Sequence, residues 1–306
     1  MTDRKVITGL AITALTAGMI AVLTSCSADG GGTDRAPEYQ AKGDTTITLS
    51  FNQMTMESMD ARTRGDGWAT RGLTRGTLTE AGMTRLDVWI SDGTATQDFH
   101  QAKTDDGFGT VTATLNKTKT YTLYAIAHKA TAACTLSEGV VSFPDDSPKE
   151  SCWYSTSFTP ATASSLNCAM QRITGKFTLS TTDAVPEAAT KMRFVIKSTA
   201  TRYSVSAGPT NVIDRTVDYT SITRKPADNT ANFNMNILAA SDAVTNFEIV
   251  VTAYDADDNI LQTRTFVDVP IRNGYVTRYA GTFFIDSGMT MSFTASDWVE
   301  YDETTY

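Results

Sequence analysis

Histidine and cysteine are scarce in this sequence, and their scarcity removes whole classes of site. Its 306 residues include two histidines and four cysteines, with no Cys-x-x-Cys pair. A zinc centre therefore has no recognisable ligand set, and we expect no metal and no cofactor. The sequence also lacks a Gly-x-Ser-x-Gly elbow and a glycine-rich phosphate loop after a strand. We name no catalytic residue and expect a protein that is not an enzyme.

Positive charge is in deficit as well. The chain has 26 Lys and Arg against 34 Asp and Glu, a net charge of -8 at pH 7. Nucleic-acid binding needs clustered Lys and Arg to neutralise phosphates, so we expect no nucleic-acid partner.

The longest apolar run stands at the start of the chain. Arg4 and Lys5 precede an uncharged run from Val6 to Val22. A positive segment followed by an apolar one predicts a secretory signal peptide over residues 1–25. The run is shorter than the roughly 20 apolar residues that a bilayer span needs. A transmembrane anchor or an ordinary signal peptide remains the alternative.

The residues that follow this run, Leu23-Thr24-Ser25-Cys26, resemble a bacterial lipobox. The resemblance implies that Cys26 is acylated and becomes the first residue of the mature chain. Acyl chains at about 0.8 kcal/mol per buried methylene would hold the protein on a membrane. Residues 26–43 contain three consecutive glycines and predict a flexible lipidated tether.

Three further cysteines remain, at positions 134, 152 and 168. Export permits a disulfide, but three thiols cannot all pair within one chain. Three half-buried thiols, or one disulfide and a spare thiol, are both open.

Alternating apolar residues predict an all-β protein. The first predicted strand, Thr46–Phe51, places Ile47, Leu49 and Phe51 on one face. Similar strands follow, among them Met83–Ser91 and Tyr121–His128, and the second is apolar on both faces and therefore central. Many short strands with almost no helix are typical of β-sandwiches.

A change of phase divides the chain. The apolar positions are even-numbered from Leu166 to Met170 and odd-numbered from Ile173 to Leu179. Such a change indicates a bulge, a bend or a crossing between sheets. We predict one sandwich over residues 44–170 and a second over residues 171–306.

Met54–Thr77 has neither a helical nor a strand period, and we interpret it as a long exposed loop. Its arginines, Arg62, Arg64, Arg71 and Arg75, are either solvated or targets for an arginine-specific protease, because mobile loops are where nicking concentrates.

Two other features have a structural and a functional interpretation. The turn Asp255–Asn259 is either a solvated hairpin tip or a calcium site, although it lacks the glycine and distal glutamate of a calcium loop. His128 ends a buried strand and is better explained as a hydrogen-bonded core residue than as a base. A carboxylate pair for glycoside hydrolysis is set in space, so the sequence leaves an enzyme on a sandwich as a rival.

Four stretches then carry a family resemblance: MTRLDVWISDG at 83–93, GTVTATLNKTKTYTLYAIAHKA at 109–130, LNCAMQRITGKFTLSTTDAVPEAATKMRFVIKS at 166–198 and VPIRNGYVTRYAGTFF at 269–284. Together with the lipobox, their order resembles the Bacteroidales fimbrillin superfamily, and within it the fimbrial anchor and minor subunit family. The resemblance implies two tandem transthyretin-like β-sandwiches, lipid-anchored at the cell outer membrane and displayed on its surface, in a type V fimbria (pilus).

In that family, stalk subunits lose their first strand to an arginine-specific protease, and a neighbour's strand fills the groove. An anchor subunit keeps its first strand and its lipid. The resemblance thus implies that Ile47, Leu49 and Phe51 fill the first-strand groove. The partners would be other fimbrial subunits, membrane lipid through Cys26, and a host or bacterial surface receptor. The tail Val299–Tyr306 is short and acidic, which favours an anchor or minor subunit.

A different class of protein is the main alternative: a surface glycan-binding lipoprotein of a polysaccharide uptake system. It would need an exposed aromatic platform, for which Trp68, Trp153 and Trp298 are the candidates.

Overall fold

The computed structural model describes residues 43–59, 70–162, 164–240, 243–285 and 292–297. Residues 40–306 belong to one compact unit. Its elements are almost all strands, as predicted, with two short 3-10 turns at Pro144–Asp146 and Pro160–Thr162. Within the described residues, no helix has the length and apolarity to cross a membrane.

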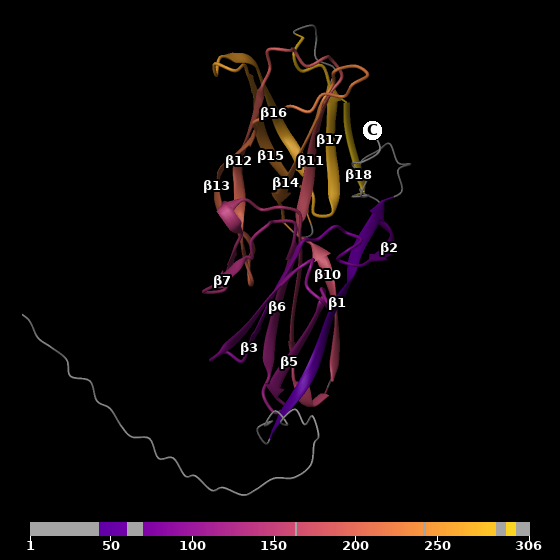
Figure 1. Cartoon of the computed structure of the whole chain (residues 1–306), viewed down its shortest axis with the longest axis vertical. Coiled ribbons are helices and arrows are strands. Elements are labelled where there is room, and N and C mark those ends of the chain that lie inside the picture. The colour runs from indigo at the N-terminus through magenta and orange to yellow at the C-terminus, as the bar shows by residue number, and fades with distance from the viewer. Residues whose placement is uncertain (1–42, 60–69, 163, 241–242, 286–291, 298–306) are drawn as a thin grey trace, which may run out of the picture. The chain divides into compact units, whose positions relative to one another are not determined.

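The strands form two sheets (Figure 1). The first sheet contains β1 Asp44–Met59, β2 Thr70–Gly76, β3 Arg85–Ser91, β4 Thr96–Ala102, β5 Thr110–Asn116, β6 Tyr121–His128, β9 Ser151–Phe158 and β10 Ser165–Arg172. The second contains β7 Thr135–Ser137, β8 Val140–Ser142, β11 Thr174–Thr181, β12 Lys191–Ser204, β13 Gly208–Tyr219, β14 Asn232–Leu238, β15 Thr245–Tyr254, β16 Ile260–Ile271, β17 Tyr275–Gly281 and β18 Ser292–Asp297.

The same order of seven strands occurs twice along the chain. In the first copy, β1 lies between antiparallel β5 and parallel β10, while β3 pairs with β4 and β6, and β6 with β9. In the second copy, β11 lies between antiparallel β14 and parallel β17, while β12 pairs with β13 and β15, and β15 with β16. Each copy is thus a three-stranded and a four-stranded layer, and we call the copies the first and second modules.

Each module has its own core. Leu86, Val88 and Ile90 of β3 are buried in the first core, while Trp89 on the other face of β3 joins a third cluster, as their alternation predicts. The second core contains Phe177, Phe194 and other buried residues of β11 to β16. The chain passes from β10 to β11 at Ile173, so the predicted change of phase is the crossing between the two sheets.

The third cluster draws residues from both modules. Trp89, Ile126 and Trp153 pack with Ala200, Tyr203 and other apolar residues of the second sheet. The hairpin β7–β8 lies in the first half of the sequence but pairs with β12 of the second sheet. In Figure 1 its magenta β7 accordingly stands beside β12 and β13. The two modules are therefore joined by packing and by backbone hydrogen bonds. Whether residues 44–170 and 171–306 fold independently stays a prediction.

Candidate functional site

The candidate site is β1 and the groove that it fills. Ile47, Leu49 and Phe51 are each 0 % exposed, and all three belong to the first core. Thr46 and Asn52 are exposed on the opposite face. The period of two that predicted this strand thus reflects one face in the core and one outside it.

The strand is longer than its sequence pattern predicts. A register shift between Ser50 and Gln53 places one extra residue in β1 against β10. Because a bulge reverses the faces of the residues that follow, the buried set changes from odd positions to Met54, which is 1 % exposed. The apolar alternation therefore stops at Phe51 although the strand continues to Met59.

Two strands would line the groove if β1 left it. Residues Asp44–Ser50 pair with β5, and Thr48–Thr55 pair in parallel with β10. The buried side chains on these neighbours include Val111 and Leu115 of β5 and Met170 of β10. An incoming strand would find backbone hydrogen bonds on both sides and an apolar floor, which are the requirements of strand addition.

The predicted loop over Met54–Thr77 is wrong for most of its length. Met54–Met59 continue β1, and Arg71 and Arg75 lie in β2, where Arg75 pairs with Thr55. A peptide bond inside a ladder must leave it before a protease can bind it in an extended form. Cleavage after Arg71 or Arg75 therefore requires local opening of β2. Arg62 and Arg64 lie outside the described residues, as do Cys26 and the predicted signal peptide.

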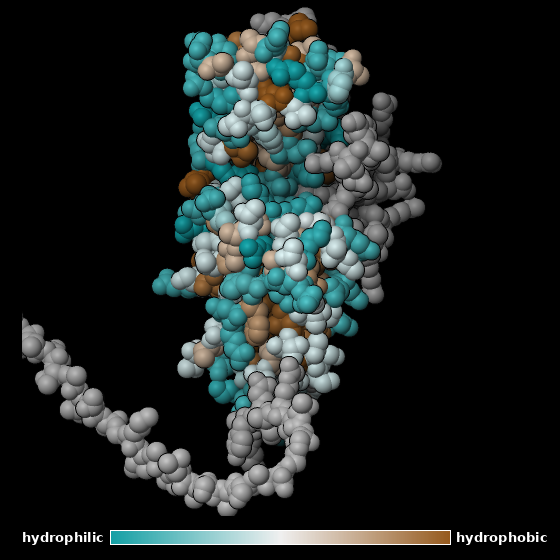
Figure 2. Space-filling view, in the orientation of Figure 1, coloured by the Kyte–Doolittle hydropathy of each residue, from teal (hydrophilic) through white to brown (hydrophobic). Residues whose placement is uncertain are grey.

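Several sheet edges are open to a partner strand among the described strands. β13 pairs only with β12, and β16 pairs only with β15. Val212 on β13 and Val267 on β16 are 62 % and 63 % exposed. On the face in view in Figure 2, hydrophobic residues form small separate groups on a mostly hydrophilic surface.

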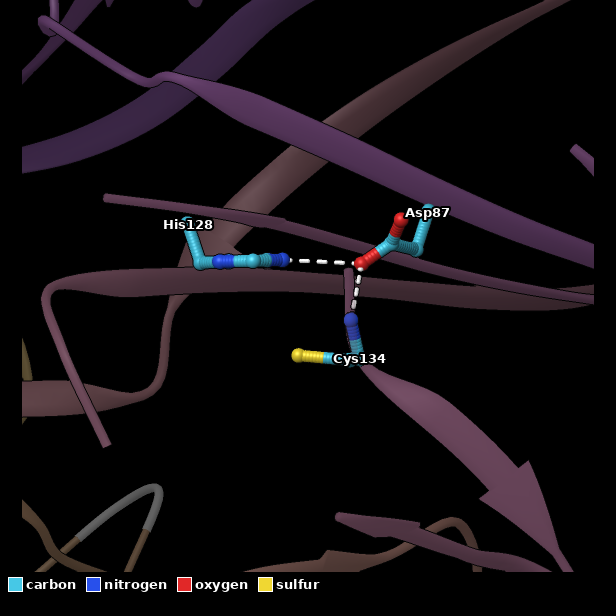
Figure 3. A group of neighbouring side chains, drawn as sticks. All are labelled: Asp87, His128 and Cys134. Carbon is cyan, nitrogen blue, oxygen red and sulfur yellow. Dashed lines mark hydrogen bonds and ion pairs between the residues drawn. The ribbon is translucent and has the colours of Figure 1, made fainter. Parts of the chain in front are cut away.

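The structure also assembles a polar cluster that the sequence analysis missed. Asp87 of β3 is fully buried, and its Oδ2 accepts bonds from His128 Nε2 at 2.8 Å and from the Cys134 N–H at 2.7 Å (Figure 3). Its Oδ1 lies 2.8 Å from Nδ1 of the half-exposed His100. The one sequence signal is an acidic residue inside an apolar strand, on the same face as Trp89, because a buried carboxylate requires a partner.

This cluster does not fit a metal ion, although ligand atoms of Asp87, His128 and Cys134 lie within 4.8 Å of one another. The Ala130 N–H donates to His128 Nδ1, so Nε2 carries the proton and donates it to Asp87. A metal on Nε2 would need that proton removed and Nδ1 protonated against the Ala130 N–H. His128 is a hydrogen-bonded core residue, as predicted.

The three cysteines described are buried, and none of them is in a disulfide. Burial raises the pKa of the Cys134 thiol, and the charge of Asp87 raises it further. Burial also raises the pKa of Cys168 to about 12. Both thiols are therefore protonated and unreactive near neutral pH. Of the two thiol arrangements left open by the sequence, the structure has the one without a disulfide among Cys134, Cys152 and Cys168.

Two other candidates are placed as well. Trp153 is 9 % exposed and its ring lies 5.1 Å from that of Tyr203, so it is no platform for a glycan. Trp68 and Trp298 lie outside the described residues. Asp255 accepts the N–H groups of Asp257 and Asn259, so the acidic turn is closed by its own hydrogen bonds.

Comparison with protein families gives one match. The model described as a family of unknown function (DUF6562) matches residues 148–300, half of the chain. The chain belongs to this family. The match begins just before β9 and extends across β18. No curated protein matches the sequence.

Three of the solved structures that resemble this chain come from Bacteroides and Porphyromonas species. A candidate cell adhesion protein from Bacteroides ovatus ATCC 8483 is 16% identical, with 85% of this chain and 100% of that chain covered and a TM-score of 0.46. A candidate cell adhesion protein from Bacteroides fragilis NCTC 9343 is 13% identical, with coverage of 84% and 100% and a TM-score of 0.48. The fimbrial anchor protein Mfa2 from Porphyromonas gingivalis is 11% identical, with coverage of 83% and 97% and a TM-score of 0.42. All three scores are below 0.5, and these likenesses alone assign no function.

Proposed function

We propose that this protein is a lipid-anchored structural subunit of a type V fimbria, an anchor or minor subunit that joins its neighbours by strand addition and supports adhesion. The observation that carries the proposal is the position of β1. It is the first strand of the first module, its apolar face is fully buried, and it pairs on both sides. A subunit that keeps such a strand has a closed groove and meets its partner at another sheet edge.

Energetics require that a strand occupies the groove of β1. Burying a large aliphatic or aromatic side chain stabilises a fold by about 1.5–3 kcal/mol. Four such side chains of β1, those of Ile47, Leu49, Phe51 and Met54, are at most 1 % exposed. An empty groove would expose its apolar lining to water, so the first module requires some strand in this position. Retention of β1 corresponds to an anchor, and its replacement by a neighbour's strand corresponds to a stalk subunit.

The membrane attachment rests on the amino-terminal sequence. A lipobox at Leu23-Thr24-Ser25-Cys26, where the signal peptide of residues 1–25 meets the mature chain, would place lipid on Cys26, and the tether that follows would lift the modules from the headgroups. We extend the proposal to an outer-membrane, surface-exposed location and to a role without catalysis. The buried, protonated Cys134 beside Asp87 is consistent with that last point.

Membrane fractionation of the native host tests the lipid anchor. Cys26→Ala should move the protein from the membrane fraction to the soluble fraction, because the variant has no thiol to acylate. Ser27→Ala is the matched control, since it alters the neighbouring residue and keeps the thiol. Retention of Cys26→Ala in membranes would refute the anchor.

Mass spectrometry of the mature protein from the same host tests the position in the fimbria. A mass that retains Cys26 with lipid indicates an anchor. A mature chain that begins after Arg62 or Arg64, or after Arg71 or Arg75 in β2, indicates a processed stalk subunit and contradicts the anchor assignment.

A further inference from the structure

A shallow pocket of about 370 Å³ opens where β3 begins and where β4 and β6 end. Eight residues line it: Thr84, Arg85, Ala102, Lys103, Thr104, Lys129, Ala130 and Thr131. Three of them are cationic and none is acidic, in a chain whose net charge is -8. The pocket is therefore positively charged, although the protein as a whole carries a net negative charge.

Two of these cations have no carboxylate partner among the described residues. Arg85 donates from Nε and Nη2 to the carbonyl oxygen of Thr131, at 3.0 and 2.8 Å, and these bonds hold the guanidinium in place. Lys103 is exposed on the segment after β4. Lys129 differs, because its Nζ lies 3.0 Å from Glu150 Oε2, a carboxylate that Lys129 shares with Arg172. Arg85 and Lys103 are thus the cations of the pocket that have no carboxylate partner within the described residues.

Two cations favour a ligand with a negative charge, and the remaining lining residues indicate which other chemical groups that ligand carries. They are three threonines and two alanines, with no aromatic or large apolar side chain. Pockets for small ligands begin at about 300 Å³, so the volume suits one or two sugar rings. Hydroxyl groups can donate to and accept from the hydroxyls of a sugar, while a planar guanidinium matches a carboxylate or sulfate.

We propose that this pocket binds an anionic sugar, with Arg85 and Lys103 contacting its carboxylate or sulfate group. The site goes beyond the proposed fimbrial function, since neither the β1 groove nor the lipid anchor uses any of its residues. An acidic peptide, such as the carboxyl-terminal segment of a second copy, is the competing occupant. The hydroxyl-rich lining favours the sugar.

Isothermal titration calorimetry tests the site by measuring the affinity of the full chain, in detergent micelles, for galacturonate oligosaccharides. Binding should be absent for the same oligosaccharides as methyl esters, which keep the rings and lose the charge. Lys103→Gln should weaken binding about threefold, and Arg85→Gln combined with Lys103→Gln about tenfold, as expected for exposed charged contacts. Lys103 is exposed, so the single variant should leave the fold unchanged.

Lys117→Gln provides the matched control. Lys117 is exposed in the turn before β6, whereas the pocket lies beyond the other end of that strand. It carries the same charge change and should alter affinity less than twofold. An equal loss of affinity in Lys103→Gln and Lys117→Gln would overturn the site. Binding of the methyl esters as tight as that of the charged oligosaccharides would overturn it as well. Binding of a synthetic peptide of residues 296–306, with none of the sugar, would assign the pocket to an acidic peptide instead. Membrane fractionation is unaffected by the pocket variants, so this test and the anchor test fail separately.

Discussion

The two modules share one strand order but differ in how their first strand is attached. In the first module, β1 follows a predicted tether and leads into residues 60–69 and β2. In the second, β11 follows β10 after a single residue, Ile173, and leads into the segment before β12. One cut after β1 would free it from the strands with which it pairs, whereas β11 would need two. Exchange of the first strand is therefore open to the first module only.

In each module, side chains of one edge strand donate hydrogen bonds to the backbone of a strand in the other layer. In the first, Gln97 and Gln101 of β4 donate from Nε2 to the carbonyl oxygens of Thr114 and Thr110 at the edge of β5. In the second, Arg215 and Tyr219 of β13 donate to the carbonyl oxygens of Asn236 and Asn234 at the edge of β14.

The groups that do this differ in burial. Gln97 is exposed, while Arg215 is buried and burial lowers its pKa to about 10. The second module thus has a buried cation among these bridging groups, whereas the first module has one exposed amide and one part-buried amide.

The largest effect should come from a charge placed in either first strand. Leu49→Asp and Leu179→Asp both bury a carboxylate at a site that is 0 % exposed, and each should destabilise its module by several kcal/mol. Chemical denaturation measures both.

A peptide of residues 44–59 would then separate the two modules. Added in trans, it should raise the melting temperature of Leu49→Asp, because the groove can accept a second copy of β1. It should not change that of Leu179→Asp. An unchanged melting temperature for Leu49→Asp itself would show that β1 does not contribute to the fold, and equal rescue of both variants would remove the distinction between the modules.

The next effect concerns the buried carboxylate of the first module. Asp87→Ala leaves the His128 Nε2–H and the Cys134 N–H without an acceptor in a fully buried site. Unmet buried donors cost about 1–3 kcal/mol each, so a loss of several kcal/mol is expected in urea unfolding. Asp98→Ala is the control, since Asp98 lies on the exposed strand β4. A comparable loss in both would show that the cluster does not stabilise the first module.

Apolar alternation predicted the strands that have one face in a core. Those containing Ile47, Leu86 and Leu179 are all present, because burial of one face imposes a period of two. The edge strands β4 and β13 were missed, since most of their side chains are exposed and show no such period. The hairpin β7–β8 was missed as well. Its turn residues Glu138 and Gly139 both have positive φ, but Glu-Gly is a weak signal for that turn.

The sequence pattern did not predict the register in which the strands pair. The cluster around Asp87 depends on the pairing of Asp87 with His100 and on the approach of the segment that leads to β7. The pocket likewise needs Arg85, Lys103 and Lys129 to meet from three segments. The segment that contains Arg71 and Arg75 shows no apolar alternation, which indicated a loop. Both residues lie in β2, which is held by backbone hydrogen bonds to β1.

The smallest effect should come from the ion pair that crosses β12 and β13 at the edge of the second module. Arg193 donates to both carboxylate oxygens of Asp218, at 2.8 Å each, and this bond holds the pKa of Asp218 below its usual 3.8. A depressed folded-state pKa stabilises the protein above the unfolded value, and the contribution is lost as the pH falls through the folded value. Asp218→Asn should therefore cost no more than about 1 kcal/mol at pH 7, as for other pairs near the surface. Urea unfolding from pH 7 to pH 2 should show the gap between the variant and the native protein closing below pH 4. A gap that persists unchanged at pH 2 would show that the carboxylate acts through packing, and that the edge of the second module does not depend on this charge.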